Sequence, residues 1–235
     1  DAGEELLGAK LTLTGTDFNG KAVYFSEDQI QKGESAIILE KDGTTLQFLS
    51  GKTATLVKNL PDGTYTLEEN AAPAGYDVTT KIEFKIENGK VVDSSYVTEA
   101  QNGNPAVVTM KDAMFKTDVV ISKADTDSGE ELLGATLTLT GTDAKGEAVY
   151  FAEDQIVKGE SAIILEKDGT TLKYLSGSTS TLIKGLPDGT YTLEENAAPA
   201  GYDVTTKITF KIENGKVVDS SYVTAANGNN PAVVT

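Results

Sequence analysis

The chain consists of short runs in which apolar and polar residues alternate, with little helical periodicity. Many runs are separated by Asn-Gly or Asp-Gly pairs, at Asn19-Gly20, Asp42-Gly43, Asp62-Gly63 and Asn88-Gly89. Both residues of such a pair tolerate the positive φ that a two-residue hairpin turn requires. The pattern predicts about eight to ten short strands per 120 residues or so, and therefore an all-β sandwich.

An internal repeat divides the chain in two. Shifted by 126 residues, positions 1–109 align with positions 127–235 without a gap, and 91 of the 109 are identical. This period matches an independent domain rather than a solenoid repeat of about 20–50 residues. Residues 110–126 hold no Gly/Ser-rich or Pro-rich linker. We therefore predict two tandem, Ig-related or prealbumin-like β-sandwich domains, 1–115 and 116–235, that follow one another almost directly.

Composition removes most enzyme classes. The chain has 36 Asp and Glu against 20 Lys and Arg, a net charge of -16, and neither His nor Cys. This balance disfavours binding to nucleic acid or to a membrane surface, and no apolar run approaches the roughly 20 residues of a membrane span. Disulfides, thiolate chemistry, the usual zinc sites and a Ser-His-Asp triad are excluded. We expect no cofactor, no metal and no membrane insertion.

Ionisable residues fall on the apolar faces of several predicted strands. Side chains two apart share a face. Each such residue continues an apolar face: Glu69 after Tyr65 and Leu67, Glu195 after Tyr191 and Leu193, Lys123 after Val119 and Ile121, and Asp112 after Val108 and Met110. A lone charge there would cost several kcal/mol. Either each group turns outward to water at a strand end, or a lysine, an aspartate and a glutamate meet inside the sandwich.

The second interpretation, in which the three groups meet inside the sandwich, would allow a chemical reaction between them. Burial favours a neutral amine and a neutral carboxylic acid, so the two can coexist side by side. The amine is then a nucleophile and the protonated aspartate its electrophile, while a glutamate transfers protons as water leaves. The product is an amide between the side chains of Lys and Asp. It would crosslink a chain that has no cysteine.

Two identical stretches carry a family resemblance. Leu60–Tyr76, LPDGTYTLEENAAPAGY, and its copy Leu186–Tyr202 resemble the signature of Cna B-type domains of Gram-positive surface adhesins and pilins. Val119–Lys123 is similar to the first strand of that family, and Val108–Ala113 to its last strand. The resemblance covers essentially the whole chain. It implies a prealbumin-like, Ig-related sandwich that is closed by a self-formed isopeptide bond.

The resemblance also implies the role of each residue. Lys123 matches the reactive lysine, Asp112 the electrophile, and Glu69 and Glu195 the assisting glutamate. Each copy lacks one member of the set. The counterpart of Lys123 would lie four residues before Asp1, and that of Asp112 three residues beyond position 235.

Asp112 and Lys123 are not expected to complete one set with each other. The first and last strands of the family run in parallel, and a parallel crossover needs a dozen or more residues. Only ten residues separate these two. Two explanations stay open for the missing end strands. They belong to a longer polypeptide, or strand exchange with another chain supplies them.

The sequence predicts structural stalk or spacer modules of an extracellular, cell-wall-attached adhesin or pilin-like protein of a Gram-positive bacterium. Neighbouring modules of the same protein are the expected partners, and crosslinking is a single self-reaction rather than enzyme turnover. The alternative is a module whose sandwich loops bind a host matrix protein or glycan. The chain has no Trp, and its tyrosines are expected mostly within strands, which does not favour that alternative. A hydrolase with paired carboxylates, as in glycosidases, is the third hypothesis.

Overall fold

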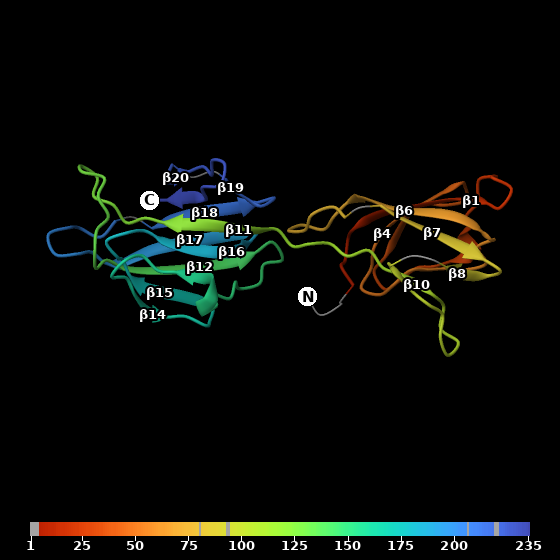
Figure 1. The fold of residues 1–235 in the computed structure, drawn as a ribbon, viewed down its shortest axis with the longest axis horizontal. Helices are drawn as coiled ribbons and strands as arrows, with labels where there is room; N and C mark the ends of the chain where they lie inside the picture. The colour runs from red at the N-terminus through yellow and green to blue at the C-terminus, as the bar shows by residue number, and fades with distance from the viewer. Residues whose placement is uncertain (1–4, 80, 93–94, 206, 219–220) are drawn as a thin grey trace. The chain divides into compact units, whose positions relative to one another are not determined.

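The computed structural model describes residues 5–79, 81–92, 95–205, 207–218 and 221–235. The chain divides into two compact units, Asp1–Ala113 (unit 1) and Met114–Thr235 (unit 2) (Figure 1). Both are nearly all β, as predicted, with one short 3-10 turn each among the residues described. None of the described helical segments has the length and apolar character needed to cross a membrane.

Unit 1 contains ten described strands and one 3-10 turn. They are β1 (Lys10–Asp17), η1 (Glu27–Gln29), β2 (Ile30–Gln31), β3 (Ile37–Glu40), β4 (Thr45–Leu49), β5 (Leu56–Val57), β6 (Gly63–Ala71), β7 (Ile82–Glu87), β8 (Lys90–Val92), β9 (Val97–Thr98) and β10 (Val107–Val108).

Unit 2 repeats this order after one additional strand at its beginning. Its described elements are β11 (Lys116–Ile121), β12 (Thr136–Asp143), η2 (Glu153–Gln155), β13 (Ile156–Val157), β14 (Ile163–Glu166), β15 (Thr171–Leu175), β16 (Thr181–Pro187), β17 (Gly189–Ala197), β18 (Ile208–Glu213), β19 (Lys216–Val218), β20 (Val223–Thr224) and β21 (Ala232–Val234).

The first layer of each sandwich is the same six-stranded sheet. Its order is β3-β4-β1-β6-β7-β8 in unit 1 and β14-β15-β12-β17-β18-β19 in unit 2, and every neighbouring pair is antiparallel. Near-identical sequences therefore place β6 and β17 at the same central position. These two strands carry the predicted glutamates.

Among the residues that the structure describes, the second layer is one continuous sheet in unit 2 and two separate strand pairs in unit 1. In unit 2 the order is β13-β16-β11-β21-β20, with β11 antiparallel to β16 and parallel to β21 (Figure 1). The parallel register joins Val119 to Ala232 and Ile121 to Val234. The resemblance implied this parallel pairing of first and last strands, and the structure confirms it.

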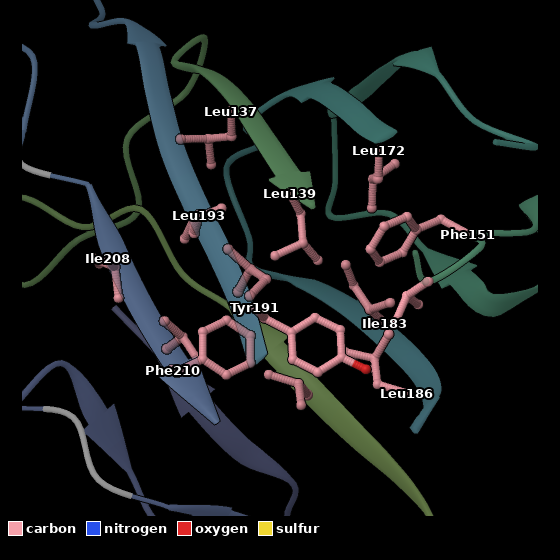
Figure 2. Close-up of a cluster of buried hydrophobic side chains, with 14 of the residues drawn as sticks. Leu137, Leu139, Phe151, Leu172, Ile183, Leu186, Tyr191, Leu193, Ile208 and Phe210 are labelled. Atoms are coloured by element: carbon pink, nitrogen blue, oxygen red, sulfur yellow. The ribbon is translucent and has the colours of Figure 1, made fainter. Parts of the chain in front are cut away.

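The hydrophobic core of unit 2 lies between its two sheets. Figure 2 shows Ile183 and Leu186 of the second layer facing Leu193 and Phe210 of the first. The ring of Tyr191 stacks on Phe210, with centroids 5.3 Å apart. The Tyr191 hydroxyl donates a hydrogen bond to the carbonyl of Pro187 at 2.6 Å, so this buried ring has a satisfied polar group.

The four predicted hairpin pairs do not all form the same turn. Asn88 and Gly89 both have positive φ, 53° and 71°, and close the β7–β8 hairpin as expected. The prediction is wrong for Asp62-Gly63, which connects β5 to β6, two strands that pair with other neighbours. A Cβ on Gly63 would lie 2.1 Å from the carbonyl oxygen of Thr16, so the glycine permits close backbone approach.

The expectation that most tyrosines lie within strands is also wrong. Within the described parts of the chain, three tyrosines lie in strands, Tyr65, Tyr174 and Tyr191, and all three are buried. Several others lie in turns and connecting segments and are about half exposed: Tyr24, Tyr96, Tyr150, Tyr202 and Tyr222. Tyrosine has an apolar ring and a polar hydroxyl, so turn positions at the surface can hold it as well as strand positions can.

Candidate functional site

A glutamate is buried at the same place in each core. Glu69 is 4% exposed and Glu195 5%. Along β6 the alternation that buries Tyr65 and Leu67 continues to Glu69, and β17 repeats the arrangement. The interpretation that these two groups turn outward to water is therefore wrong.

A backbone N–H holds one oxygen of each glutamate. Glu69 Oε2 accepts a hydrogen bond from the N–H of Thr79, and Glu195 Oε2 accepts one from Thr205, both at 2.7 Å. The other oxygen, Oε1, is buried in both units without a hydrogen-bond partner among the residues that the structure describes. Each carboxyl thus has a fixed orientation and an acceptor that is not committed to another donor.

In unit 2 the predicted lysine lies against the predicted glutamate. Lys123 Nζ is 3.3 Å from Glu195 Oε2, and the two side chains are 15% and 0% exposed. Lys123 follows the end of β11 and continues the face of the buried Val119 and Ile121. Its backbone N–H donates to Glu131 Oε2 at 3.0 Å, which holds the chain in place beyond the strand. The structure therefore brings an amine and a buried carboxylate together.

In unit 1 the predicted aspartate lies beside the equivalent glutamate. Burial raises the pKa of Glu69; the Thr79 N–H acts in the opposite direction, and the neighbouring Asp112 carboxyl raises the pKa further. Burial also raises the pKa of Asp112, and its interaction with Glu69 partly offsets the rise. Both carboxyls therefore hold a proton more strongly than they would in water, and a protonated carboxyl is the form that an amine can convert to an amide.

Each unit contains the buried glutamate and one of its two predicted reaction partners, the aspartate in unit 1 and the lysine in unit 2. Glu69 and Glu195 are 126 positions apart, at the same point of the repeat, on strands of identical sequence. Asp112 belongs to unit 1 and Lys123 to unit 2, and each lies beside the glutamate of its own unit. The backbone groups that orient the site, at Thr79 and Thr205, were not identified from the sequence, because a main-chain N–H leaves no residue-type signal.

The same substitution is expected to have opposite effects in the two units. Glu69→Gln removes the repulsion between two carboxyls and offers an amide N–H to Asp112, so it should raise the stability of unit 1 at pH 7 by about 1 kcal/mol. Glu195→Gln leaves the largely buried Lys123 without a counter-charge and should lower the stability of unit 2 by about 1–2 kcal/mol. Hydrogen exchange read by mass spectrometry, on peptides that include positions at which the two copies differ, reports each unit separately within the intact chain.

The pH dependence supplies the control for this comparison. In folded unit 1 both carboxyls keep protons at pH values where the unfolded chain has released them, so the stability of unit 1 should fall as pH rises from about 4 toward neutrality. Glu69→Gln should flatten that fall. A loss of stability in both units, with an unchanged pH profile in unit 1, would contradict the proposed pairing of Glu69 with Asp112.

Comparison with known proteins identifies the family. The model of the SpaA prealbumin-like fold domain matches twice, at residues 1–100 and 117–226. These matches cover most of the chain, which therefore belongs to this family, and they confirm the resemblance to prealbumin-like, Cna B-type domains. No curated protein matches the chain.

The solved structures with a similar fold include pilus proteins. A C-terminal fragment of the pilus adhesin SpaC from Lactobacillus rhamnosus GG aligns with a TM-score of 0.52 and 18% identity, over 97% of this chain and 87% of that fragment. A longer SpaC structure aligns with a TM-score of 0.51 and 17% identity, over 97% of this chain but only 28% of SpaC. At this identity the likeness establishes the fold alone.

Proposed function

We propose that the two units are structural stalk modules of a bacterial surface adhesin or pilin-like protein, and that an amide between a lysine and an aspartate side chain closes each complete module. The fold family and the pilus proteins of similar fold support the structural role. The observation that best supports the proposed crosslink is the 3.3 Å distance between Lys123 Nζ and Oε2 of the buried Glu195. Membership of this family suggests an extracellular position on a Gram-positive cell wall, with neighbouring modules as partners.

The reaction balances without any cofactor. The neutral amine of the lysine attacks Cγ of the protonated aspartate, so that a C–N bond forms as a C–O bond breaks. The glutamate accepts a proton from the amine nitrogen and returns it to the departing hydroxyl, which leaves as water. The anchored Oε2 and the uncommitted Oε1 of each glutamate suit this transfer. The step occurs once per module, so the protein is not an enzyme in the sense of turnover.

The position of the crosslink explains its mechanical value. Val119, Val120 and Ile121 of β11 lie in parallel beside residues 232–234 of β21, which are the first and last strands of unit 2. A covalent bond just beyond these paired residues joins both ends of the module. Tension applied through the chain then cannot separate the two strands by shear. A repeated module with this property is well suited to a load-bearing spacer.

The test completes unit 2 with the chain's own sequence. Because Thr109 and Thr235 are equivalent, a copy of residues 110–115 added after Thr235 places an aspartate in unit 2 at the position equivalent to Asp112. We expect the intact mass of this extended chain to be one water lower than its calculated mass. Proteolysis should release a peptide in which Lys123 is joined to the aspartate of the extension.

Two variants separate the chemistry from the fold. Lys123→Ala and Glu195→Gln in the extended chain should both restore the full calculated mass, the first by removing the nucleophile and the second by removing proton transfer. Unchanged secondary structure by circular dichroism would show that both variants still fold. An unmodified mass in the folded extended chain would eliminate the self-crosslinking proposal for this sequence.

A second candidate function is binding of a host matrix protein or glycan through the loops. The exposed tyrosines favour it, in particular Tyr24 and its repeat Tyr150, which are 57% and 56% exposed. Saturable binding of the chain to one member of a panel of matrix proteins and glycans, lost in Tyr24→Ser/Tyr150→Ser, would support this function. Retention of binding in that variant would exclude these tyrosines as the contact.

A further inference from the structure

Two loops of unit 2 begin at the two members of the candidate site. One leaves β11 at Ile121, just before Lys123, and leads into β12. The other leaves β17 at Ala197, just after Glu195, and leads into β18. Each loop also carries a side chain that bonds to the other loop, and neither of these side chains has a role in the chemistry described above.

The first loop forms a tight turn around Asp125. Asp125 Oδ1 accepts hydrogen bonds from the N–H groups of Asp127 at 2.8 Å and Ser128 at 2.7 Å. The Asp125 carbonyl accepts another from Gly129 at 2.9 Å, and the positive φ of this glycine, 73°, lets the chain reverse. One carboxyl oxygen is therefore committed within the turn, while Oδ2 is available to a donor from outside it.

The second loop forms a turn that presents Tyr202. The N–H of Tyr202 donates a hydrogen bond to the carbonyl of Pro199 at 3.1 Å. Gly201, the third residue of this turn, has a φ of 92°, a conformation that a side chain would disfavour. The main chain around Tyr202 is therefore fixed before its side chain makes any contact with the first loop.

A hydrogen bond joins the two turns. The Tyr202 hydroxyl donates to Asp125 Oδ2 at 2.9 Å, across 77 positions of sequence. The N–H of Ser128, the Tyr202 hydroxyl and the N–H of Asp127 together lower the pKa of Asp125 to about 2. The acceptor is therefore ionised at neutral pH, and a hydrogen bond to an ionised acceptor is stronger than one between neutral groups. We call this contact the Tyr202–Asp125 bridge.

The bridge lies close in sequence to both members of the candidate site. Asp125 follows Lys123 by two residues. Tyr202 precedes Thr205 by three, and the N–H of Thr205 is the donor that holds Glu195 Oε2 at 2.7 Å. The bridge therefore ties the segment that carries the amine to the segment that orients the carboxyl.

We propose that Tyr202 and Asp125 are positioning residues, whose hydrogen bond joins the two loops and thereby holds Lys123 Nζ against Glu195. This inference rests on the proposed crosslink, because it assigns the residues that prepare the same site. Lys123 lies beyond the end of β11, where strand pairing alone fixes it less well. Holding two reacting groups in place lowers the barrier of the step between them.

The first test needs no amide and uses the 235-residue chain. The nuclear Overhauser effect (NOE) between Hε of Lys123 and Hγ of Glu195 reports their distance, and Lys123→Arg identifies the lysine signals by their loss. Tyr202→Phe removes only one hydroxyl. We expect it to weaken this NOE at least about two-fold, because supporting hydrogen bonds hold such groups to within about 0.5 Å and the NOE falls with the sixth power of distance.

Two further variants test whether the bridge is responsible. Tyr76→Phe makes the same change in the identical stretch of unit 1 and should leave this NOE unchanged. Asp125→Asn keeps one oxygen for the turn, but its amide nitrogen cannot accept the tyrosine proton, so it should weaken the NOE as Tyr202→Phe does. The double variant should lose no more, because both changes remove one bond. An unchanged NOE in Tyr202→Phe, or an equal loss in Tyr76→Phe, would overturn the proposal.

The second test measures the rate of amide formation. The chain extended by residues 110–115 is synthesised in a short cell-free pulse, and its intact mass is followed over time. Tyr202→Phe should slow the loss of water at least about three-fold. Identical time courses would overturn the proposal. So would a urea midpoint in the unreactive Lys123→Ala background that falls far enough to explain the slower reaction, since the bridge would then be merely structural.

The two tests separate this proposal from the crosslink itself. If the extended chain with Tyr202 intact forms no amide, the proposed crosslink is wrong. The NOE series in the 235-residue chain then decides alone whether the bridge positions Lys123. A weakened NOE together with a slower reaction in Tyr202→Phe would support both proposals.

Discussion

Unit 2 with its completing extension is expected to be about 4–5 kcal/mol more stable than the same chain in which the aspartate of the extension is replaced by alanine. The amide closes a loop of roughly 110 residues, and closure on that scale removes conformational entropy from the unfolded chain. For a domain of this size the midpoint of thermal unfolding should rise by roughly 15–25 °C. Urea unfolding followed by hydrogen exchange of unit 2 peptides measures the difference.

Unit 1 is the internal reference for this measurement. Its stability should be the same in both chains, because neither the extension nor its alanine variant alters residues 1–113. Equal stability of unit 2 with and without the amide would contradict the expected gain. Such a result would mean that β11 and β21 are already held together in the unfolded ensemble, or that the amide strains the native fold.

Truncation of a leucine that both copies of the repeat share is expected to have very different costs in the two units. Leu186→Ala should destabilise unit 2 by about 2–4 kcal/mol, because Leu186 is 1% exposed on β16, which pairs with β11 in the same sheet. Leu60→Ala removes the same atoms at the equivalent position of unit 1, where the side chain is only partly buried. It should cost about 1 kcal/mol. Denaturant unfolding with unit-specific hydrogen exchange compares the two variants.

A chain with one more strand tests the cause of this difference in burial. If the chain carries a copy of residues 116–126 before Asp1, Leu60 should become buried, and the cost of Leu60→Ala should rise toward that of Leu186→Ala. Equal costs in the original chain would mean that Leu60 is covered as fully as Leu186. The second layer of unit 1 would then not be open.

The sequence alone predicted the fold class and most of the candidate site. Alternation along Gly63–Glu69 placed Glu69 on the apolar face of its strand, because a strand has a period of two residues and the apolar Tyr65 and Leu67 set its phase. The near-identity of the two copies then transferred that assignment to Glu195. Whether Glu69 turns outward at the strand end or is buried was left open by the sequence and is decided by the structure, where it is buried. The Asn88-Gly89 hairpin was predictable as well, because its chemistry is local.

Other features depended on contacts between distant segments. From the sequence, Asp62-Gly63 was predicted to form one more hairpin turn. In the structure it connects two strands of different sheets, and Gly63 packs closely against the backbone of Thr16. The location of most tyrosines in turns was missed for a related reason. A turn residue is exposed or buried according to what packs over it, and alternation holds no information about that.

The sequence by itself determined two tandem β-sandwiches and the residue types of the site, because period-two alternation and a 126-residue repeat are properties of the chain alone. Only the tertiary structure decided how the second layers are built. Identical residues at 60 and 186 differ in burial because β11 pairs with the strand that carries residue 186, whereas among the residues described no strand takes that place beside residue 60. Strand pairing is non-local, so its effect on Leu60, Glu69 and Asp112 depends on which strand lies beside them and not on the residues themselves.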